Sequence, residues 1–174
     1  HGLSGLGAVA LARGLVCGAL MATLTKSRER VTLQVVGDGP LRGVTVDSND
    51  LGEVRGYVRA RPTPRLVAPA GPRPSLADAI GRAGEVVVHR DLGMEHIYQG
   101  VTTLRSGEID EDVEAYLRES EQMPSALRCA VGLDEQGGVT AAAGVLVQTL
   151  PGGGDAIIAG PAERLAAGWL EQHL

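Results

Sequence analysis

The sequence has no phenylalanine, and only 2% of its 174 residues are aromatic. A chain near this length buries roughly 70% of the surface that it exposes when unfolded, so a sizeable core is available. That core must be built from valine, leucine, isoleucine and alanine. Basic residues are also in the minority, and the net charge is −5. This charge argues against a nucleic-acid partner, because binding to a phosphate backbone calls for a basic surface.

Cysteine is scarce as well, since Cys17 and Cys129 are the only two. Cys17 lies in a predicted apolar helix and Cys129 in a predicted strand, so we expect both to be buried and reduced. Zinc held by thiolates alone needs more cysteines than this. The sequence also has no GxSxG elbow, and neither cysteine has a residue beside it that could act as its general base. We therefore predict no catalytic residue and no enzyme.

The run from residue 6 to residue 24 is almost entirely apolar and allows three interpretations. A transmembrane span needs about 20 apolar residues, but Arg13 lies in the middle of this run and would cost roughly 2.5–3.5 kcal/mol on insertion. A signal peptide needs basic residues before the apolar stretch, and the first four residues have none. A helix that is apolar all round is otherwise the central helix of a soluble core, which is our prediction.

The strand pattern predicts an antiparallel meander followed by hairpins. Alternation predicts strands at Val31–Val35, around Val44–Val46 and at Val54–Val58, with tight turns between them. Glu85–His89 is predicted to be a strand buried on both faces. Leu127–Leu133 and Val139–Leu150 are predicted to pair as a hairpin. Gly37 and Gly39 of the first turn are assigned to this turn rather than to a phosphate loop, because a strand and not a helix follows them.

Small and conformationally special residues predict the connections between these strands. Five prolines between Arg61 and Pro74 predict an extended surface loop, and Ser75 begins a short helix. The segment Ala141–Gly144 is so small that we expect the helix at residues 6–24 to pack closely against it. Gly152–Gly154 breaks the fold, and Pro161 is predicted to open a last amphipathic helix.

The region from Tyr98 to Pro124 is predicted to be a strand, a turn and a helix. Ser106 is the predicted N-cap, and Pro124 stops the helix. One apolar stripe faces the core and consists of Ile109, Val113, Tyr116 and Leu117. The carboxylates lie opposite, so we predict a solvated face with a surface pair between Glu114 and Arg118. A metal site of Asp110, Asp112 and Glu114 is rejected, because a helix splays its side chains instead of folding them round one ion.

A second group of possible metal ligands consists of His89, Asp91, Glu95 and His96, which lie within eight residues. The turn at Gly93 could bring the last two back across the first two. Ordinary turn polarity explains the same residues, so we predict no metal and no cofactor in this chain. Together these patterns predict an α+β fold: a small antiparallel meander and hairpins packed with a buried central helix and flanking helices.

Four stretches resemble the heat-shock protein 33 family in the same order. The longest is Y-Q-G-V-x-x-L-x-S-G-E-I-x-E-D-V-E-x-Y-L-x-x-S-E-Q-M-P-S-A, from Tyr98 to Ala126. The others are L-Q-V-V-G-D-G-P-L-R-G with G-E-V-R-G-Y-V, then H-R-D-L-G-M, and A-A-G-V-L-V-Q-T-L-P-G. The resemblance implies a redox-regulated, ATP-independent holdase chaperone, which binds unfolding proteins through apolar surface and forms dimers when active. We also expect a cytoplasmic location and no binding to nucleic acid or membrane.

The resemblance also implies a division of the chain. Residues 1–152 would be the chaperone core, without the family's first strand and helix, and residues 153–174 the start of a helical linker. The family's zinc is held by a C-terminal module with C-x-C and C-x-x-C, and this sequence has neither motif. Neither cysteine is assigned to that zinc, and the client-binding residues are unknown. The alternatives are a structural or interaction domain without client capture, and a metal-dependent enzyme.

Overall fold

The computed structural model describes residues 5–25, 29–59, 74–93, 97–149 and 156–166, together with residues 168, 170 and 172. Its helices are α1 (Leu6–Ala22), α2 (Ala77–Ile80), α3 (Ile109–Glu119) and α4 (Ala156–Ala166). Its strands are β1 (Arg30–Gly37), β2 (Gly43–Asn49), β3 (Val54–Val58), β4 (Gly84–Asp91), β5 (Ile97–Thr103), β6 (Ser125–Leu133) and β7 (Val139–Gln148).

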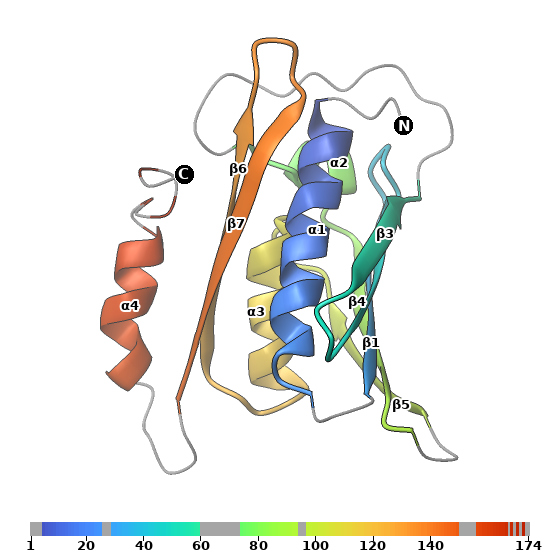
Figure 1. Cartoon of the computed structure of the whole chain (residues 1–174), viewed down its shortest axis with the longest axis vertical. Helices are drawn as coiled ribbons and strands as arrows, with labels where there is room; N and C mark the ends of the chain where they lie inside the picture. Colours follow the sequence, from blue (N-terminus) through green and yellow to red (C-terminus); the bar gives the residue numbers. More distant parts are fainter. Residues whose placement is uncertain are drawn as a thin grey trace.

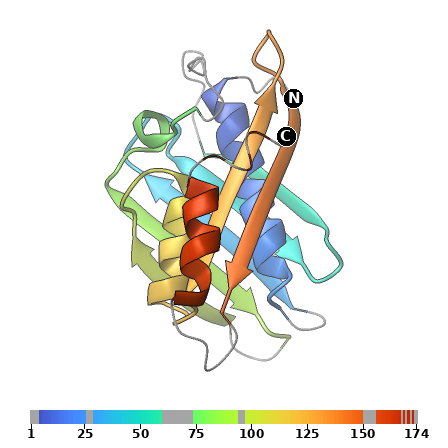
Figure 2. The same cartoon turned by 90° about the vertical axis from the view of Figure 1, so that its left-hand side faces the viewer.

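These elements form four layers (Figure 1). A five-stranded sheet in the order β3-β2-β1-β4-β5 makes one side of the molecule, and all its neighbouring strands are antiparallel. Helices α1 and α3 lie between this sheet and the β6-β7 hairpin. Helix α4 lies on the outer side of the hairpin, as Figure 2 shows. The predicted α+β class, the meander and the hairpin are confirmed.

The inner face of the sheet is aliphatic because every second residue of its strands is apolar. The following residues of β1, β2 and β4 are completely buried there: Val31, Leu33, Val35, Val44, Val46, Val86 and Val88. Val87 points to the opposite face and is still only 6% exposed. The prediction that this strand is buried on both faces is therefore confirmed.

Helix α1 is the central helix of the domain, as predicted. It contacts the large sheet on one side and the hairpin on the other. Small residues allow this double contact: a Cβ at Gly18 would lie 2.6 Å from Cγ1 of Val46, and a Cβ at Gly144 would overlap Cγ1 of Val16. The predicted close packing of residues 141–144 against this helix is thereby confirmed. No helix in the described part of the chain is long and apolar enough to cross a membrane.

Two predicted helix starts are wrong. The N-cap of α3 is Glu108 rather than Ser106, which instead accepts the backbone N–H of Glu108 through its hydroxyl at 3.0 Å. Helix α4 begins at Ala156, so Pro161 lies inside it. The preference of proline for the first turn is statistical, and the apolar residues before Pro161 already form helix.

Some predictions fall outside the described residues. These are the loop at residues 61–73, Glu95 and His96 of the metal site that was considered and not assigned, the break at residues 152–154, and the side chains of Trp169 and Leu174. The predicted division of the chain at residue 152 stays a prediction.

Candidate functional site

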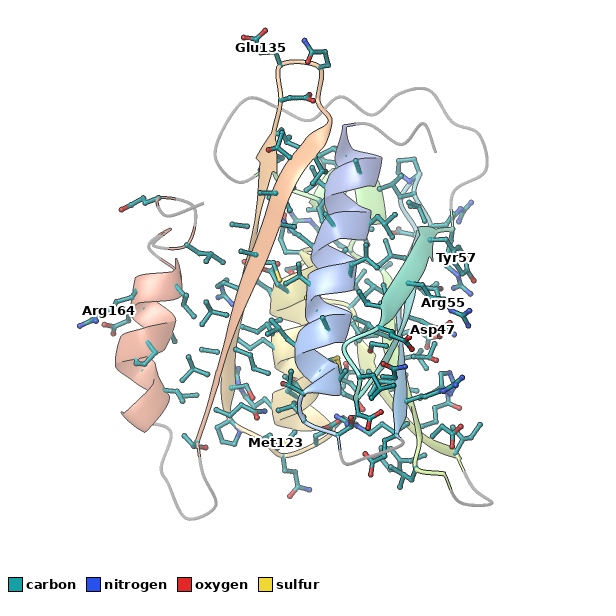
Figure 3. The ribbon with its side chains drawn as sticks, in the orientation of Figure 1. Asp47, Arg55, Tyr57, Met123, Glu135 and Arg164 are labelled. Atoms are coloured by element: carbon teal, nitrogen blue, oxygen red, sulfur yellow. The ribbon has the colours of Figure 1, made fainter. Side chains whose placement is uncertain are left out.

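The outer face of the five-stranded sheet is the side turned away from α1 and α3 (Figure 1). Strand register aligns one residue from each strand into rows across this face, because paired residues share a face. One such row consists of Tyr57, Thr45, Gln34, Val87 and Val101. Its two ends are the exposed ones: Tyr57 is 57% and Val101 48% accessible. Figure 3 shows Tyr57 on β3 pointing outward.

Large exposed apolar side chains lie on the two edge strands of this sheet and in the turn before β3. We call the following set the sheet-edge residues: Leu51, Val54, Tyr57, Ile97, Tyr98 and Val101. Among the described residues, Val139 on the hairpin is the other large apolar side chain that is this exposed. The sheet-edge residues form two sets of three, one at each of the two opposite edges of the sheet. Exposed apolar side chains at an edge strand mark a place of contact with other chains. The edge strands β3 and β5 also carry backbone groups that a further strand can pair with.

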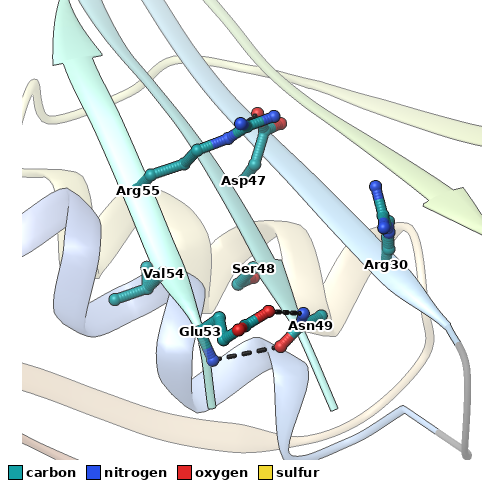
Figure 4. A pocket seen from close by; sticks show the side chains of 7 residues that line it. All are labelled: Arg30, Asp47, Ser48, Asn49, Glu53, Val54 and Arg55. Carbon is teal, nitrogen blue, oxygen red and sulfur yellow. Dashed lines mark hydrogen bonds and ion pairs between the residues drawn. The ribbon is translucent and has the colours of Figure 1, made fainter. Parts of the chain in front are cut away.

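A shallow pocket of about 290 Å³ lies beside the β2-β3 turn (Figure 4). Four of its polar side chains bind one another in pairs. The Asn49 amide donates to the Glu53 carboxylate at 2.7 Å, and the Asn49 side-chain oxygen accepts the Glu53 backbone N–H at 3.0 Å. Arg55 donates to Asp47 at 3.3 Å. The pocket is therefore a hydrogen-bonded turn rather than a set of groups that awaits a ligand.

An apolar groove of about 480 Å³ lies between β7 and α4. Its walls are Val145, Val147, Gly160, Pro161, Arg164 and Leu165. It opens on the hairpin face that is turned away from α1, so it is separate from the sheet-edge residues (Figures 1 and 3).

Of the four possible metal ligands that were considered and not assigned, the structure describes His89 and Asp91, whereas Glu95 and His96 lie outside the described residues. His89 and Asp91 share the outer face of β4 and line a depression of about 200 Å³ together with Arg30, Thr32, Asp47, Arg55 and Ile97. No group of three or more histidine, cysteine, aspartate or glutamate side chains among the described residues could hold a metal ion. The rejection of Asp110, Asp112 and Glu114 as a site agrees with their contacts, because these three carboxylates bind protein donors.

Those contacts contradict the prediction of a solvated helix face. Asp110 is completely buried and Asp112 is 2% exposed. Oδ2 of Asp110 accepts the backbone N–H of Cys129 at 2.9 Å. Asp112 accepts the backbone N–H groups of residues 105, 106 and 107 at 2.8–3.0 Å. The prediction failed because it considered the helix alone, whereas β6 and the preceding turn cover this face. The predicted pair of Glu114 and Arg118 is confirmed at 2.9 Å.

Arg13 lies at the centre of a second buried polar cluster. Its guanidinium is 1% exposed and binds the Glu108 carboxylate at 2.6 Å and the Pro74 carbonyl at 3.0 Å. Glu108 also accepts the backbone N–H of Leu76 at 2.9 Å. This cluster joins α1, α2 and the start of α3. The sequence contained a signal that was not used: a single arginine in an apolar core helix must have a buried partner.

Cys17 and Cys129 are both free, fully buried and in contact, with their sulfur atoms 3.6 Å apart. The prediction that they are buried and reduced agrees with this arrangement. The contact with Cys129 and the burial of the site raise the pKa of the Cys17 thiol well above its usual value, so this thiol is protonated at neutral pH. Two thiols in a core without further ligands do not fit a zinc site.

The described residues define an α+β domain of two antiparallel sheets. The family model for Hsp33 protein matches residues 1–169. The 33 kDa chaperonin of Geobacter sulfurreducens is 41% identical over 167 residues, which cover 96% of this chain and 55% of the relative. The 33 kDa chaperonin of a Synechococcus strain is 42% identical over 169 residues, which cover 95% of this chain and 52% of the relative.

The fold has a solved counterpart. The crystal structure of the 33 kDa chaperonin from Thermotoga maritima matches with a TM-score of 0.71 and 38% identity, over 83% of this chain and 48% of that one. The chain belongs to the Hsp33 family, which is not a class of enzymes. It spans about half the length of the curated relatives that it matches.

Proposed function

We propose that this chain is the client-binding body of an ATP-independent holdase chaperone. Two facts support the proposal: the chain belongs to the Hsp33 family, and its relatives carry the name chaperonin. The observation that carries it is the exposure of the sheet-edge residues at the two edges of the sheet. An exposed apolar surface holds non-native chains without directional contacts, because the hydrophobic effect depends on the area buried and not on orientation.

The sheet edges suit such clients for a second reason. Unfolding chains expose both apolar side chains and unpaired backbone, and an edge strand offers partners for each. Tyr57 and Val101 are the strongest single candidates for client contact, because they lie on opposite edges in the same row of the outer face. In both pockets on this face Arg55 binds Asp47, so these two charges are already paired with each other.

Regulation by zinc and oxidants is proposed for the full-length family protein. There we expect zinc to be held by four cysteine thiolates, whose oxidation exposes the apolar surface. This chain does not contain such a set, so we propose that its own client binding is constitutive. We further propose a cytoplasmic location, clients that are unfolding proteins, homodimer formation, and no binding to nucleic acid or membrane, in line with the net charge of −5.

Light scattering from a heat-denatured test protein checks this proposal. At a near-stoichiometric ratio the chain should suppress aggregation, and Tyr57→Asp and Val101→Asp should each weaken the suppression at least about threefold, because a charge on an apolar surface opposes client burial. Val139→Asp is the matched control, since Val139 is an exposed valine on the other sheet. Circular dichroism confirms that each variant is folded.

The same assay separates the alternatives. A domain that only binds a folded partner, without client capture, would leave aggregation unchanged at every ratio. Hydrogen peroxide should change the suppression less than about twofold if binding is constitutive, because the 174 residues tested contain no set of four cysteines to be oxidised. A strong requirement for peroxide, or equal losses for Val139→Asp and Val101→Asp, would contradict the proposal.

A further inference from the structure

The two cysteines of this chain lie far apart in the sequence and meet in the core. Cys17 belongs to α1 and Cys129 to β6, 112 positions later, and their sulfur atoms are 3.6 Å apart. Both side chains are completely buried. They are the only thiols of the chain, so any disulfide within one molecule must join this pair.

The surrounding structure holds the two sulfur atoms together. Gly144 is paired with Cys129 across the hairpin, and a Cβ there would lie 3.2 Å from the Cys129 sulfur and 3.0 Å from Cδ1 of Leu20. The missing side chain lets α1 approach the hairpin at this point. Asp110 binds the backbone N–H of Cys129, and Arg13 binds Glu108 one turn of α1 away from Cys17. Both backbones are thus fixed on either side of the sulfur contact.

We propose that Cys17 and Cys129 are an oxidation site of this domain, at which a peroxide or a small disulfide oxidant forms a covalent link between α1 and β6. The sulfur atoms, now 3.6 Å apart, must approach by about 1.6 Å to reach the S–S bond length of about 2.05 Å. The link is independent of the zinc module of the family and of the proposed client binding.

The reaction with hydrogen peroxide balances with the two thiols alone. The first sulfur attacks one peroxide oxygen, and the products are a sulfenic acid and water. The second sulfur then attacks the sulfenic sulfur and expels hydroxide, which leaves as water with the second thiol proton. Two electrons pass from the sulfur pair to the peroxide, and two water molecules form for each disulfide.

Burial determines how fast this site reacts. Thiolate is the reacting form, and the contact with Cys129 together with burial raises the pKa of Cys17. The oxidant reaches the pair when α1 and the hairpin open locally. The site therefore forms its disulfide slowly, in contrast to an exposed cysteine of low pKa. In a reducing compartment the pair stays reduced until oxidant is added.

Mass spectrometry of the intact 174-residue chain tests the proposal. The folded protein is treated with hydrogen peroxide, unfolded, and treated with an alkylating reagent. We expect most molecules to take up no reagent, to have lost two hydrogen atoms, and to yield one cross-linked pair of peptides containing residues 17 and 129. Cys17→Ala is the matched control and should keep one thiol that reacts. Molecules that still bind two equivalents of reagent, or that form only disulfides between chains, would overturn the proposal.

A glutathione equilibrium tests the same proposal without a variant. The measured quantity is the ratio of squared reduced glutathione to oxidised glutathione at which half of the disulfide is reduced. If the fold holds the sulfur atoms together, this ratio should be at least about tenfold higher in buffer than in denaturant. The oxidised protein should also melt at least about 5 °C higher than the reduced protein, because the link closes a loop of more than 100 residues. Equal ratios in buffer and in denaturant would mean that the fold does not favour the link.

Discussion

Two arginine–carboxylate pairs of this domain have the same chemistry and opposite surroundings. Arg13 and Glu108 lie 2.6 Å apart, with 1% and 13% of their side chains exposed. Arg55 and Asp47 lie 3.3 Å apart on the outer face of the sheet, with 83% and 44% exposed. The first pair joins α1 to the start of α3, whereas the second joins the neighbouring strands β2 and β3. Burial, and not the identity of the two residues, decides which pair the fold depends on.

The difference has a simple physical origin. Removing one partner of a buried pair leaves a charge without water or a counter-ion, and this is costly even when the intact pair contributes little. An exposed pair is surrounded by water and salt, so either partner can be lost with small effect. Three substitutions test this contrast, from the largest expected effect to the smallest.

Arg13→Ala should destabilise the domain most. The substitution leaves the Glu108 carboxylate and the Pro74 carbonyl without their guanidinium partner, and we expect a loss of about 3–5 kcal/mol in the free energy of unfolding. Urea denaturation followed by circular dichroism measures this loss. Arg55→Ala is the matched control, and losses of the same size for both variants would end the distinction between the two pairs.

Asp112→Ala should have the next largest effect. Its carboxylate accepts three consecutive backbone N–H groups before α3, and their loss should cost about 2–3 kcal/mol, because hydrogen bonds to a charged acceptor are strong. Asp112→Asn keeps one acceptor oxygen and should lose less. Hydrogen exchange should become faster at the amides of residues 105–107, and unchanged protection there would contradict the assigned role.

Arg55→Ala should have the smallest effect, less than about 1 kcal/mol, since most of its side chain is in water. The remaining difference between this variant and the unchanged protein should disappear at about 1 M salt, where the screening length is near 3 Å. Denaturation at low and high salt measures both quantities. A loss above 2 kcal/mol would show that the outer face is more tightly coupled to the core than its exposure indicates.

The helix α3 shows how far prediction from sequence reached. Its stripe of Ile109, Val113, Tyr116 and Leu117 was predicted from spacing alone, and all four residues are completely buried. The same helix shows where prediction failed. Asp110 and Asp112 were expected in solvent, and they bind backbone N–H groups of β6 and of the preceding turn. Apolar periodicity reveals which face is buried, but it does not reveal a polar face that another element covers.

The sheet-edge residues show the same limit of prediction from sequence. The resemblance in four ordered stretches predicted the family, which the comparisons confirm. It did not indicate that the β4-β5 hairpin joins the meander through β1, so that β3 and β5 become the two edges. Tyr57 and Val101 belong to different hairpins in the sequence and to one row of the sheet in the fold. These two side chains share the outer face of the sheet because the strands of the two hairpins pair in this order.

By itself, the sequence determined the α+β class, the extent of most strands and helices, the aliphatic core and the family, because these depend on composition, local periodicity and long matching stretches. The tertiary structure alone decided which strands became edges, that Arg13 found Glu108, and that Cys17 met Cys129. These are contacts between residues far apart in the chain. Local spacing carries no information about them, since they form only when separate elements pack against a common core.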